Sequence, residues 1–326
     1  MEMTFINVGY GDAILIQNQG FTLLLDGGSA LPEEFADSAY RVPAVEYLHA
    51  AGISRIDLLI LSHIHEDHVC GLESIVEQIP VDEIRLPFDP EVFQSAKEVM
   101  PDHSAPRSAH LFSRALNAAG RILQRADREG IPVKALRYGD KMHLPGGLEL
   151  SVLAPAKSTC ERFTSLLQKV YTLDDPTEAL IEMDRTSNAT SLLIALACDD
   201  VKCLLAADSV PSNWAESDFH VLKNENVLKL PHHGQIDSFH EFFMGNMPLE
   251  YVITTASSDR RYNSANHQVY EALRKLHPNV KFLFTDEREY PPFFSKPDGF
   301  HAIKLVMDSG QIEPEFIKIN KKEITR

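Results

Sequence analysis

An apolar run that ends in a cluster of histidines constrains what this chain can fold into more than any other feature. Residues 55–62 read RIDLLILS, a continuous apolar stretch typical of a strand buried on both faces. The sequence HIHEDH follows directly at residues 63–68, and residues 69–79 (VCGLESIVEQI) return to helical spacing. The pattern predicts that the cluster lies in a loop between a buried strand and a helix.

The side chains in this loop predict metal ligation by His63, His65, Asp67 and His68. His63 and His65 point to the same side of an extended segment, because side chains alternate along a strand with a period of two. Asp67 and His68 come from the start of the helix, so they can hold a second ion beside the first. Imidazole and carboxylate groups suit Zn²⁺, which we expect first, and also Mn²⁺ or Fe²⁺. The alternative, an ordinary acidic residue at a helix N-terminus, explains Asp67 alone.

A site for two divalent transition-metal ions per chain also needs a bridging carboxylate and a further imidazole, and two apolar strands end in such groups. Residues 201–209 (VKCLLAADS) end near Asp208, and residues 227–235 (VLKLPHHGQ) end near His232 and His233. A turn residue is the alternative interpretation of Asp208, and a surface turn is the alternative for the two histidines. The pattern leaves open which of these two histidines is the ligand.

Composition places the chain among soluble globular proteins. Of its 326 residues, 44% are hydrophobic and 24% are charged, and no apolar run is long enough to cross a bilayer. The formal net charge of −16 argues against nonspecific adhesion to nucleic acid or to an anionic membrane. The first residues lack the basic start of a signal peptide, so we expect a cytoplasmic protein without a membrane partner.

Strand and helix patterns alternate through the whole chain without a composition break. The runs 3–8, 12–17 and 21–26 predict an antiparallel meander, because turn residues containing glycine separate them. A helical pattern extends from about residue 90 to residue 130, and shorter helices are expected near 238–244 and 266–276. We expect an α/β fold in a single domain over 1–326, with a helical insertion at about 88–131.

Several of these blocks together resemble a known family. HIHEDH resembles the His-x-His-x-Asp-His signature of the metallo-β-lactamase fold, and residues 5–28 (FINVGYGDAILIQNQGFTLLLDGG) resemble its first strands. Further blocks are similar, in the same order, to the hydrolase domain of the DNA-uptake protein ComEC and its soluble relatives: GIPVKALRYGDKMHLPGGLELSVLAP, NATSLLIALACDDVKCLLAADS, VLKLPHHG and RRYNSANHQVYEAL. The resemblance implies a four-layer αββα metallo-β-lactamase sandwich, with metals at one edge between the two sheets.

The resemblance also implies roles by position. One metal would be held by His63, His65 and Asp208. The other would be held by Asp67, His68, Asp208 and one of His232 and His233. Asp26 would orient the histidine loop by hydrogen bonding, as ligating imidazoles usually require.

The chain departs from the family pattern at Asn188, at Tyr10 and in one later stretch. Asn188 stands where lactamases carry another His and where the ComEC-like group also has Asn, which would leave the first metal more open to water or substrate and make Asn188 a residue that supports the ligands. Tyr10 stands where the family usually has Gln. In the stretch YNSANHQV, Ser264 and Asn266 replace the His-Pro pairs of relatives, and His267, a candidate substrate-binding residue, is displaced.

These observations predict a metal-dependent hydrolase, and within that class we expect a phosphodiesterase or nuclease that uses a metal-bridging hydroxide. Asp67, His232 and His233 are the candidate catalytic residues, and the imidazole beside the ligand at 232–233 could donate to a phosphate oxygen. Nucleic acid or another phosphodiester is the expected partner. The alternatives are a hydrolase of a small ester, thioester or phosphocholine-type diester, a binding or regulatory protein with a degenerate site, and redox use of a di-iron site.

The predicted insertion carries a stripe of arginines. At 100° per residue, four arginines fall within roughly a 60° arc of the helix, and they are Arg114, Arg121, Arg125 and Arg128. Such a stripe could bind a polyanion in an otherwise acidic protein. The alternative is a solvated helix face whose arginines pair with nearby acids such as Asp127 and Glu129.

Overall fold

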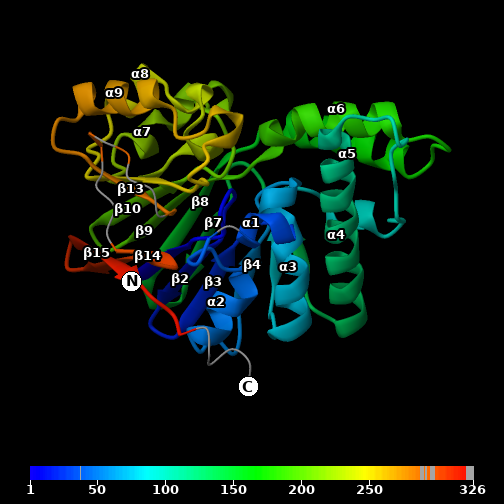
Figure 1. The fold of residues 1–326 in the computed structure, drawn as a ribbon, viewed down its shortest axis with the longest axis horizontal. Coiled ribbons are helices and arrows are strands. Elements are labelled where there is room, and N and C mark those ends of the chain that lie inside the picture. Colours follow the sequence, from blue (N-terminus) through cyan, green and yellow to red (C-terminus); the bar gives the residue numbers. More distant parts are fainter. Residues whose placement is uncertain (37, 287–289, 291, 294–297, 321–326) are drawn as a thin grey trace.

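Two β-sheets pack face to face in the computed structural model, and helices cover the outer face of each sheet (Figure 1). The structure describes residues 1–36, 38–286, 290, 292–293 and 298–320. Within these ranges the first sheet has eight strands in the order β15-β14-β1-β2-β3-β4-β5-β6, and the second has seven in the order β13-β12-β11-β10-β9-β8-β7. This arrangement is the four-layer αββα sandwich that the sequence predicted, so the fold class is confirmed.

The first sheet consists of β1 (Glu2–Ile6), β2 (Ile14–Asn18), β3 (Phe21–Leu25), β4 (Leu58–Ile60), β5 (Ile84–Leu86), β6 (Val133–Ala135), β14 (Ala302–Asp308) and β15 (Gln311–Ile317). The second consists of β7 (Lys141–Leu144), β8 (Leu148–Ala154), β9 (Leu193–Cys198), β10 (Val201–Leu205), β11 (Val227–Lys229), β12 (Tyr251–Thr254) and β13 (Lys281–Phe284). The α-helices are α1 (Pro32–Ala36), α2 (Ala44–Ala50), α3 (Glu66–Gln78), α4 (Arg107–Glu129), α5 (Lys157–Val170), α6 (Thr177–Ser187), α7 (Phe219–Leu222), α8 (Glu241–Met244) and α9 (His267–Leu276).

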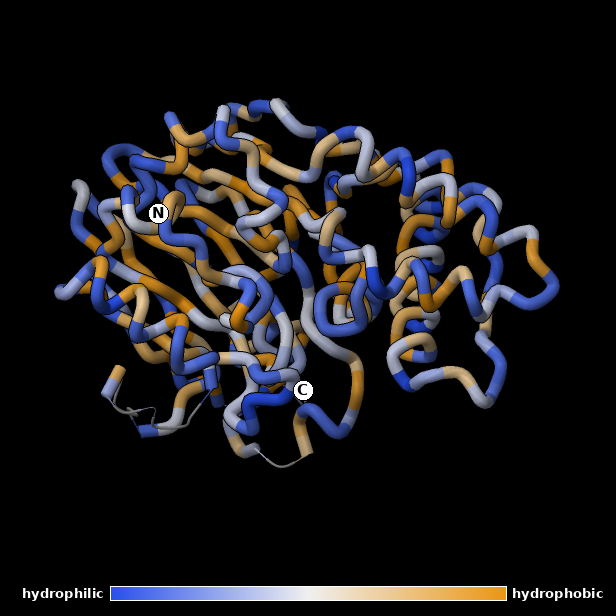
Figure 2. The backbone as a smooth tube through the Cα atoms, turned by 90° about the horizontal axis from the view of Figure 1, so that it is seen from above, coloured by the Kyte–Doolittle hydropathy of each residue, from blue (hydrophilic) through white to orange (hydrophobic). Residues whose placement is uncertain are grey.

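Three apolar clusters hold these layers together. In β2, Ile14 and Ile16 face the second sheet, whereas Leu15 faces the helices, because successive side chains of a strand point to opposite faces. The third cluster packs the outer face of the second sheet against α7, α8 and α9. Strands buried on both faces explain the continuous apolar runs of the sequence. Figure 2 shows this pattern along the chain, with long hydrophobic stretches in the strands and mostly hydrophilic loops around them.

The helices beside the sandwich come from two separate stretches of the chain. The predicted insertion contains α4, which ends at Gly130 in the left-handed conformation (φ 70°). The helices α5 and α6 were not predicted from the sequence, and they pack together with α4 (Figure 1). Their apolar residues at helical spacing, such as Phe163, Leu167 and Val170, are buried in the same cluster as α4. Among the described residues no helix is long and apolar enough to span a membrane.

Parallel pairing places the functional segments at one edge of the sandwich. In the first sheet β3 and β4 run parallel, so their carboxyl ends bring Asp26 and the histidine loop together. In the second sheet β10, β11 and β12 run parallel, so Asp208, the 232–233 turn and Thr255 leave at a common edge. Side chains far apart in the sequence therefore converge because the strands that precede them end side by side.

A close backbone approach sets the position of α3. Gly27 N donates to His68 O at 2.8 Å, and Gly71 N donates to Gly28 O at 2.9 Å. A Cβ atom at Gly71 would lie 2.0 Å from Gly27 O, far inside van der Waals contact. The absence of a side chain at Gly71 thus allows the histidine-bearing end of α3 to pack against the loop after β3.

We expect Gly71→Ala to lower the melting temperature, since overpacking at a backbone contact costs about 1–3 kcal/mol. Gly120→Ala is the matched control, because Gly120 also lies inside a helix and its Cβ would meet only Ala96 Cβ, at 3.3 Å. That change should be neutral or stabilising, by up to about 1 kcal/mol, since Gly is unfavourable inside helices. Equal melting temperatures for the two variants in thermal unfolding would contradict this account of the contact.

Candidate metal centre

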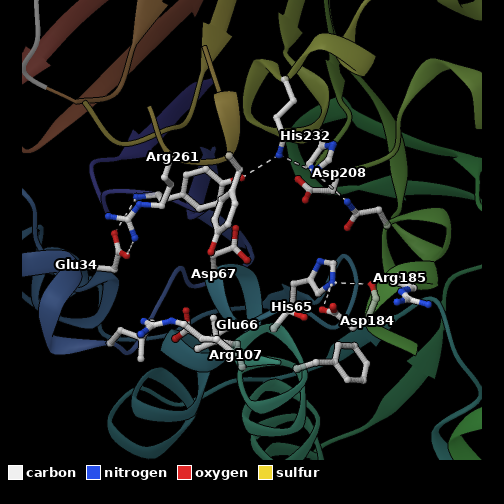
Figure 3. Close-up of a pocket in the computed structure, with 18 residues that line it drawn as sticks. Glu34, His65, Glu66, Asp67, Arg107, Asp184, Arg185, Asp208, His232 and Arg261 are labelled. Carbon is white, nitrogen blue, oxygen red and sulfur yellow. Dashed lines mark hydrogen bonds and ion pairs between the residues drawn. The ribbon is translucent and has the colours of Figure 1, made fainter. Parts of the chain in front are cut away.

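The candidate site lies in a cavity of about 400 Å³ at the edge where the parallel strands end. His65, Asp67, Asp208 and His232 are among its lining residues, as Figure 3 shows. His63, His68 and His233 lie behind them and are fully buried. All seven predicted ligand candidates therefore lie at one place, although they come from the segments after β4, β10 and β11.

One group of three side chains, His63, His65 and Asp208, offers ligand atoms that all lie within 4.8 Å of one another. His63 Nε2 lies 3.0 Å from His65 Nδ1 and 3.8 Å from Asp208 Oδ2. Ligand atoms around a tetrahedral Zn²⁺ are about 3.4 Å apart, because each sits about 2.1 Å from the ion. The spacing of this group is therefore suitable for a single ion.

A second group consists of Asp67, His68 and His233. His233 Nε2 lies 3.1 Å from Asp67 Oδ2 and 3.2 Å from Asp208 Oδ1. His68 Nε2 lies 3.4 Å from the same Asp208 oxygen. The two carboxylate oxygens of Asp208 thus face different groups, as a bridging ligand would require.

The backbone of the 231–234 turn separates the roles of the two adjacent histidines. His232 and His233 both adopt left-handed conformations, with φ of 47° and 53°, which turn their side chains in different directions. The His233 ring is fully buried, and its Nδ1 lies 2.6 Å from Thr255 O, leaving Nε2 for the second group. His232 Nδ1 instead contacts Asp237 at 3.1 Å, and its Nε2 lies 3.1 Å from Asn188 Nδ2 and 2.8 Å from Gln235 Nε2. This arrangement makes His233 the better ligand candidate.

Asp26 lies where it can hold the histidine loop. Its Oδ1 accepts a hydrogen bond from Ser62 N at 2.8 Å, and its Oδ2 accepts one from Ser62 Oγ at 2.6 Å. The same Oδ2 lies 2.8 Å from His68 Nδ1, and Ser62 Oγ lies 3.0 Å from His63 Nδ1. Carboxylate contacts of this kind fix the tautomer and orientation of a ligating imidazole.

A buried ion pair that was not predicted from the sequence lies beside His233 of the second group. Lys229 Nζ, fully buried in β11, lies 2.5 Å from Asp12 Oδ2 and donates to Ala207 O at 2.9 Å. Asp12 also accepts a hydrogen bond from Thr255 Oγ1 and lies 3.7 Å from His233 Nδ1. A lysine inside an apolar strand (VLKLP) was the available signal, because an unpaired charge is rarely buried.

The chemistry of these groups fits bound cations. His68 Nε2, His233 Nε2 and Asp208 Oδ1 are buried and, within the described part of the chain, form no hydrogen bond of ordinary geometry. Unsatisfied buried polar atoms are costly, so their convergence needs a further partner. Burial lowers the pKa of His63 well below its usual value, which leaves this imidazole neutral and able to ligate.

The electrostatics of the second group also favour positive charge. Burial alone would raise the pKa of Asp208, but the His233 and His68 imidazoles outweigh it and hold the pKa well below its usual range. Burial would lower the pKa of His68, yet the Asp208 and Asp67 carboxylates raise it well above normal. The Asp208 and Asp67 carboxylates that favour a positively charged imidazole would also attract a metal cation.

Other predicted site residues lie at different distances from the cavity. Asn188 lines it, beside His232. The four arginines of the stripe lie outside its lining residues; Arg121 pairs with Glu73 and Glu98, and Arg125 pairs with Glu129. These ion pairs match the solvated-face alternative. His267 is also remote from the lining, with its Nδ1 3.4 Å from Glu271 and its ring 5.1 Å from that of Phe293.

Several cavity residues were not predicted as site residues, although some of them, such as Glu66 and Tyr262, lie inside sequence blocks that resemble the family. They include Glu34, Glu66, Arg107, Asp184, Arg185, Gln235, Arg261 and Tyr262. Asp184, on α6, lies beside His65, with its Oδ1 3.6 Å from His65 Nε2. Glu66 accepts hydrogen bonds from Ser29 Oγ and Ala30 N, and burial raises its pKa to about 7. Arg107, in the first turn of α4, lines the cavity, whereas the arginine stripe of the same helix does not.

The chain is similar to several known proteins. Residues 6–98 match the family model described as Metallo-beta-lactamase superfamily, so this part of the chain is similar to members of that superfamily. The match includes Asp26 and the whole histidine loop. The chain is also 15% identical to the solved structure of an isothiocyanate hydrolase from Delia radicum gut bacteria, with a TM-score of 0.47 over 87% of this chain and 95% of that one.

Two curated relatives are similar in sequence. The chain is 22% identical over 298 residues to ComE operon protein 3 of Bacillus subtilis, and this alignment covers 88% of this chain and 32% of that protein. It is 31% identical over 83 residues to ribonuclease Z of Sulfolobus acidocaldarius, which covers 23% of this chain and 25% of the relative. The chain therefore matches about a third or less of the length of either protein.

We expect His233→Ala to lower the metal content of the purified, Zn²⁺-loaded protein from about two ions per chain to about one. His232→Ala should retain the wild-type content, because His232 contacts Asp237, Asn188 and Gln235 rather than the ligand groups. Elemental analysis after competition with a chelator measures both variants. His267→Ala, on the surface of α9, is the control, and loss of metal from His232→Ala alone would reverse the assignment.

Proposed function

We propose that this protein is a dinuclear metal-dependent hydrolase that cleaves phosphodiester bonds, with nucleic acid as the preferred class of substrate. The observation that supports this most is the sharing of Asp208 between two groups of ligand side chains at an open cavity. Two divalent ions held there would supply an activated water and stabilise the charge that develops on the reacting phosphate. Zn²⁺ suits the ligand set best, with Mn²⁺ or Fe²⁺ as substitutes.

The protein's own residues would orient the substrate around this centre. His232, Asn188 and Gln235 form a row of hydrogen-bonding groups beside Asp208. Gln235 Nε2 also donates to the Tyr10 hydroxyl, 3.2 Å away. These amide, imidazole and phenol groups can turn their donors toward phosphate oxygens. His233 and Asp67, as ligand candidates, would hold the reacting centre in place rather than touch the leaving group.

The charge around the cavity supports an anionic substrate. Arg107, Arg185 and Arg261 all line it, in a protein whose net charge is −16. Arg107 and Arg261 pair with Glu33 and Glu34, respectively, whereas no ion pair of Arg185 occurs among the described residues. An exposed guanidinium without an acidic partner can form a bidentate contact with a phosphate. That one relative is a ribonuclease by name agrees with this substrate class.

We expect the Zn²⁺- or Mn²⁺-loaded protein to hydrolyse bis(p-nitrophenyl) phosphate and single-stranded DNA or RNA. Hydrolysis should stop on chelation and return when metal is restored, because the ligand set is built to bind cations. Asp208→Asn should reduce turnover by at least about 10³-fold, since it removes a ligand candidate of both groups. Arg128→Gln, on the surface of α4, should leave turnover unchanged.

A matched panel of a carboxylic ester, a lactone and a thioester separates the proposal from the alternative of small-ester hydrolysis. Under the proposal, kcat/KM for a phosphodiester exceeds that for each of the other substrates. Efficient thioester or lactone hydrolysis, with no phosphodiester cleaved by the metal-loaded protein, would refute it. A metal-loaded protein inactive on the whole panel would favour a binding role.

A further inference from the structure

An aromatic surface extends from the metal centre to the mouth of the cavity. The Tyr10 ring is buried and lies 4.3 Å from the ring of His233, measured between centroids. The Tyr262 ring follows at 5.4 Å from that of Tyr10, in an edge-on arrangement of 66°. Tyr262 is 63% exposed, although it lines the cavity. A large exposed ring beside a candidate reaction centre offers a planar group a face on which to stack.

The loop that presents Tyr262 is held in an unfavourable conformation. Arg260, Tyr262, Asn263 and Ala265 all have φ between 46° and 59°, a region that non-glycine residues seldom adopt. The loop is attached to the ligand-bearing turn, because Ala265 N donates to His233 O at 3.0 Å. Asn266 N likewise donates to Gly234 O at 2.8 Å. Backbone strain that the surroundings maintain is typical of functional segments, and here it fixes the ring relative to the candidate ligand His233.

Arg261 fixes the loop from the opposite side. It pairs with Glu34, near the start of the chain, and with Asp259 at 2.9 Å. Its guanidinium carbon also lies 5.9 Å from the centre of the Tyr10 ring. The positive charge of Arg261 is thus already balanced by two acids. What the loop offers to a substrate is therefore the exposed ring of Tyr262 more than a charge.

The opposite wall of the cavity carries the complementary feature. In the view of Figure 3, Arg261 and Glu34 lie on one side of Asp67 and Asp208, and Asp184 and Arg185 lie on the other. A phosphodiester between the two ligand groups would therefore have an aromatic ring on one flank and an exposed guanidinium on the other. A polynucleotide places a base and a further phosphate on the two sides of each scissile phosphate, whereas a small ester does not.

We propose that Tyr262, backed by Tyr10, stacks an unpaired nucleobase next to the scissile phosphate, so that the substrate is a single-stranded nucleic acid. This inference rests on the proposed phosphodiesterase function and specifies its substrate class. Stacking of a base on an aromatic side chain needs the face of the base, which a neighbouring base pair covers in a duplex. The subsite therefore favours single strands over duplexes and tolerates different bases.

The test compares binding of two labelled strands by fluorescence anisotropy, using the metal-loaded protein. One is a short oligothymidylate, and the other is a strand of equal length and charge whose bases are replaced by abasic sites. Both carry phosphorothioate linkages, which resist cleavage during the measurement. We expect the wild type to bind the thymidylate strand about 5- to 150-fold more tightly, the range for stacking of one base on an aromatic side chain.

Tyr262→Ala should bind both strands alike, whereas Tyr262→Trp should keep the preference, because it retains an aromatic face. Tyr138→Ala is the matched control, since Tyr138 is 43% exposed and lies outside the cavity lining. Unchanged melting temperatures establish that the variants are folded. A preference that persists in Tyr262→Ala would overturn the proposal, as would a wild type that binds neither strand, shows no preference, or binds duplex as tightly as single strand.

The binding measurement requires no turnover, so a failure of the base subsite can be distinguished from a failure of the proposed hydrolase function. A wild type that prefers the thymidylate strand through Tyr262, yet cleaves no phosphodiester, supports the base subsite and refutes the hydrolase. A wild type that cleaves phosphodiesters but binds abasic and thymidylate strands alike refutes the subsite and leaves the hydrolase standing.

Discussion

The candidate site depends on the contacts that the Asp26 carboxylate makes with Ser62 and His68. This carboxylate is completely buried at the end of β3 and accepts from both the backbone and the hydroxyl of Ser62, while it also contacts His68 Nδ1. Ser62 in turn contacts His63, so one side chain orients an imidazole of each ligand group. Burial raises the pKa of Asp26, a cost that these hydrogen bonds partly offset. Removal of Asp26 would release the whole histidine loop rather than one ligand.

Much of this arrangement could be predicted from the sequence, because it follows from local pattern. The apolar run before His63 and the helical spacing after His68 place the loop between β4 and α3, where the structure has it. The polar residues that end other apolar runs, Asp208 and the 232–233 pair, also follow β10 and β11. Parallel pairing of these strands then brings the segments together. A polar side chain directly after an apolar strand can therefore predict a site residue from the sequence alone.

Other features depend on tertiary context and could not be read from local pattern. The preference for His233 over His232 as a ligand candidate depends on two left-handed backbone conformations, which could not be predicted from the sequence. The arginine stripe of α4 satisfies the spacing for a polyanion site, yet Glu73 and Glu98, which pair with Arg121, come from distant segments. Asp184 reaches His65 only because α6 packs beside the sandwich. By contrast, the helical period of α5 is present in the sequence, so this helix could have been predicted from local pattern.

The proposed binding of two metal ions on either side of Asp208 is tested most directly by anomalous scattering from crystals of the Zn²⁺-loaded protein. We expect two peaks, one among His63, His65 and Asp208, and the other among Asp67, His68, His233 and Asp208. A single peak in one group would contradict the dinuclear centre. Peaks elsewhere on the protein, with none at Asp208, would contradict the assignment of the site itself.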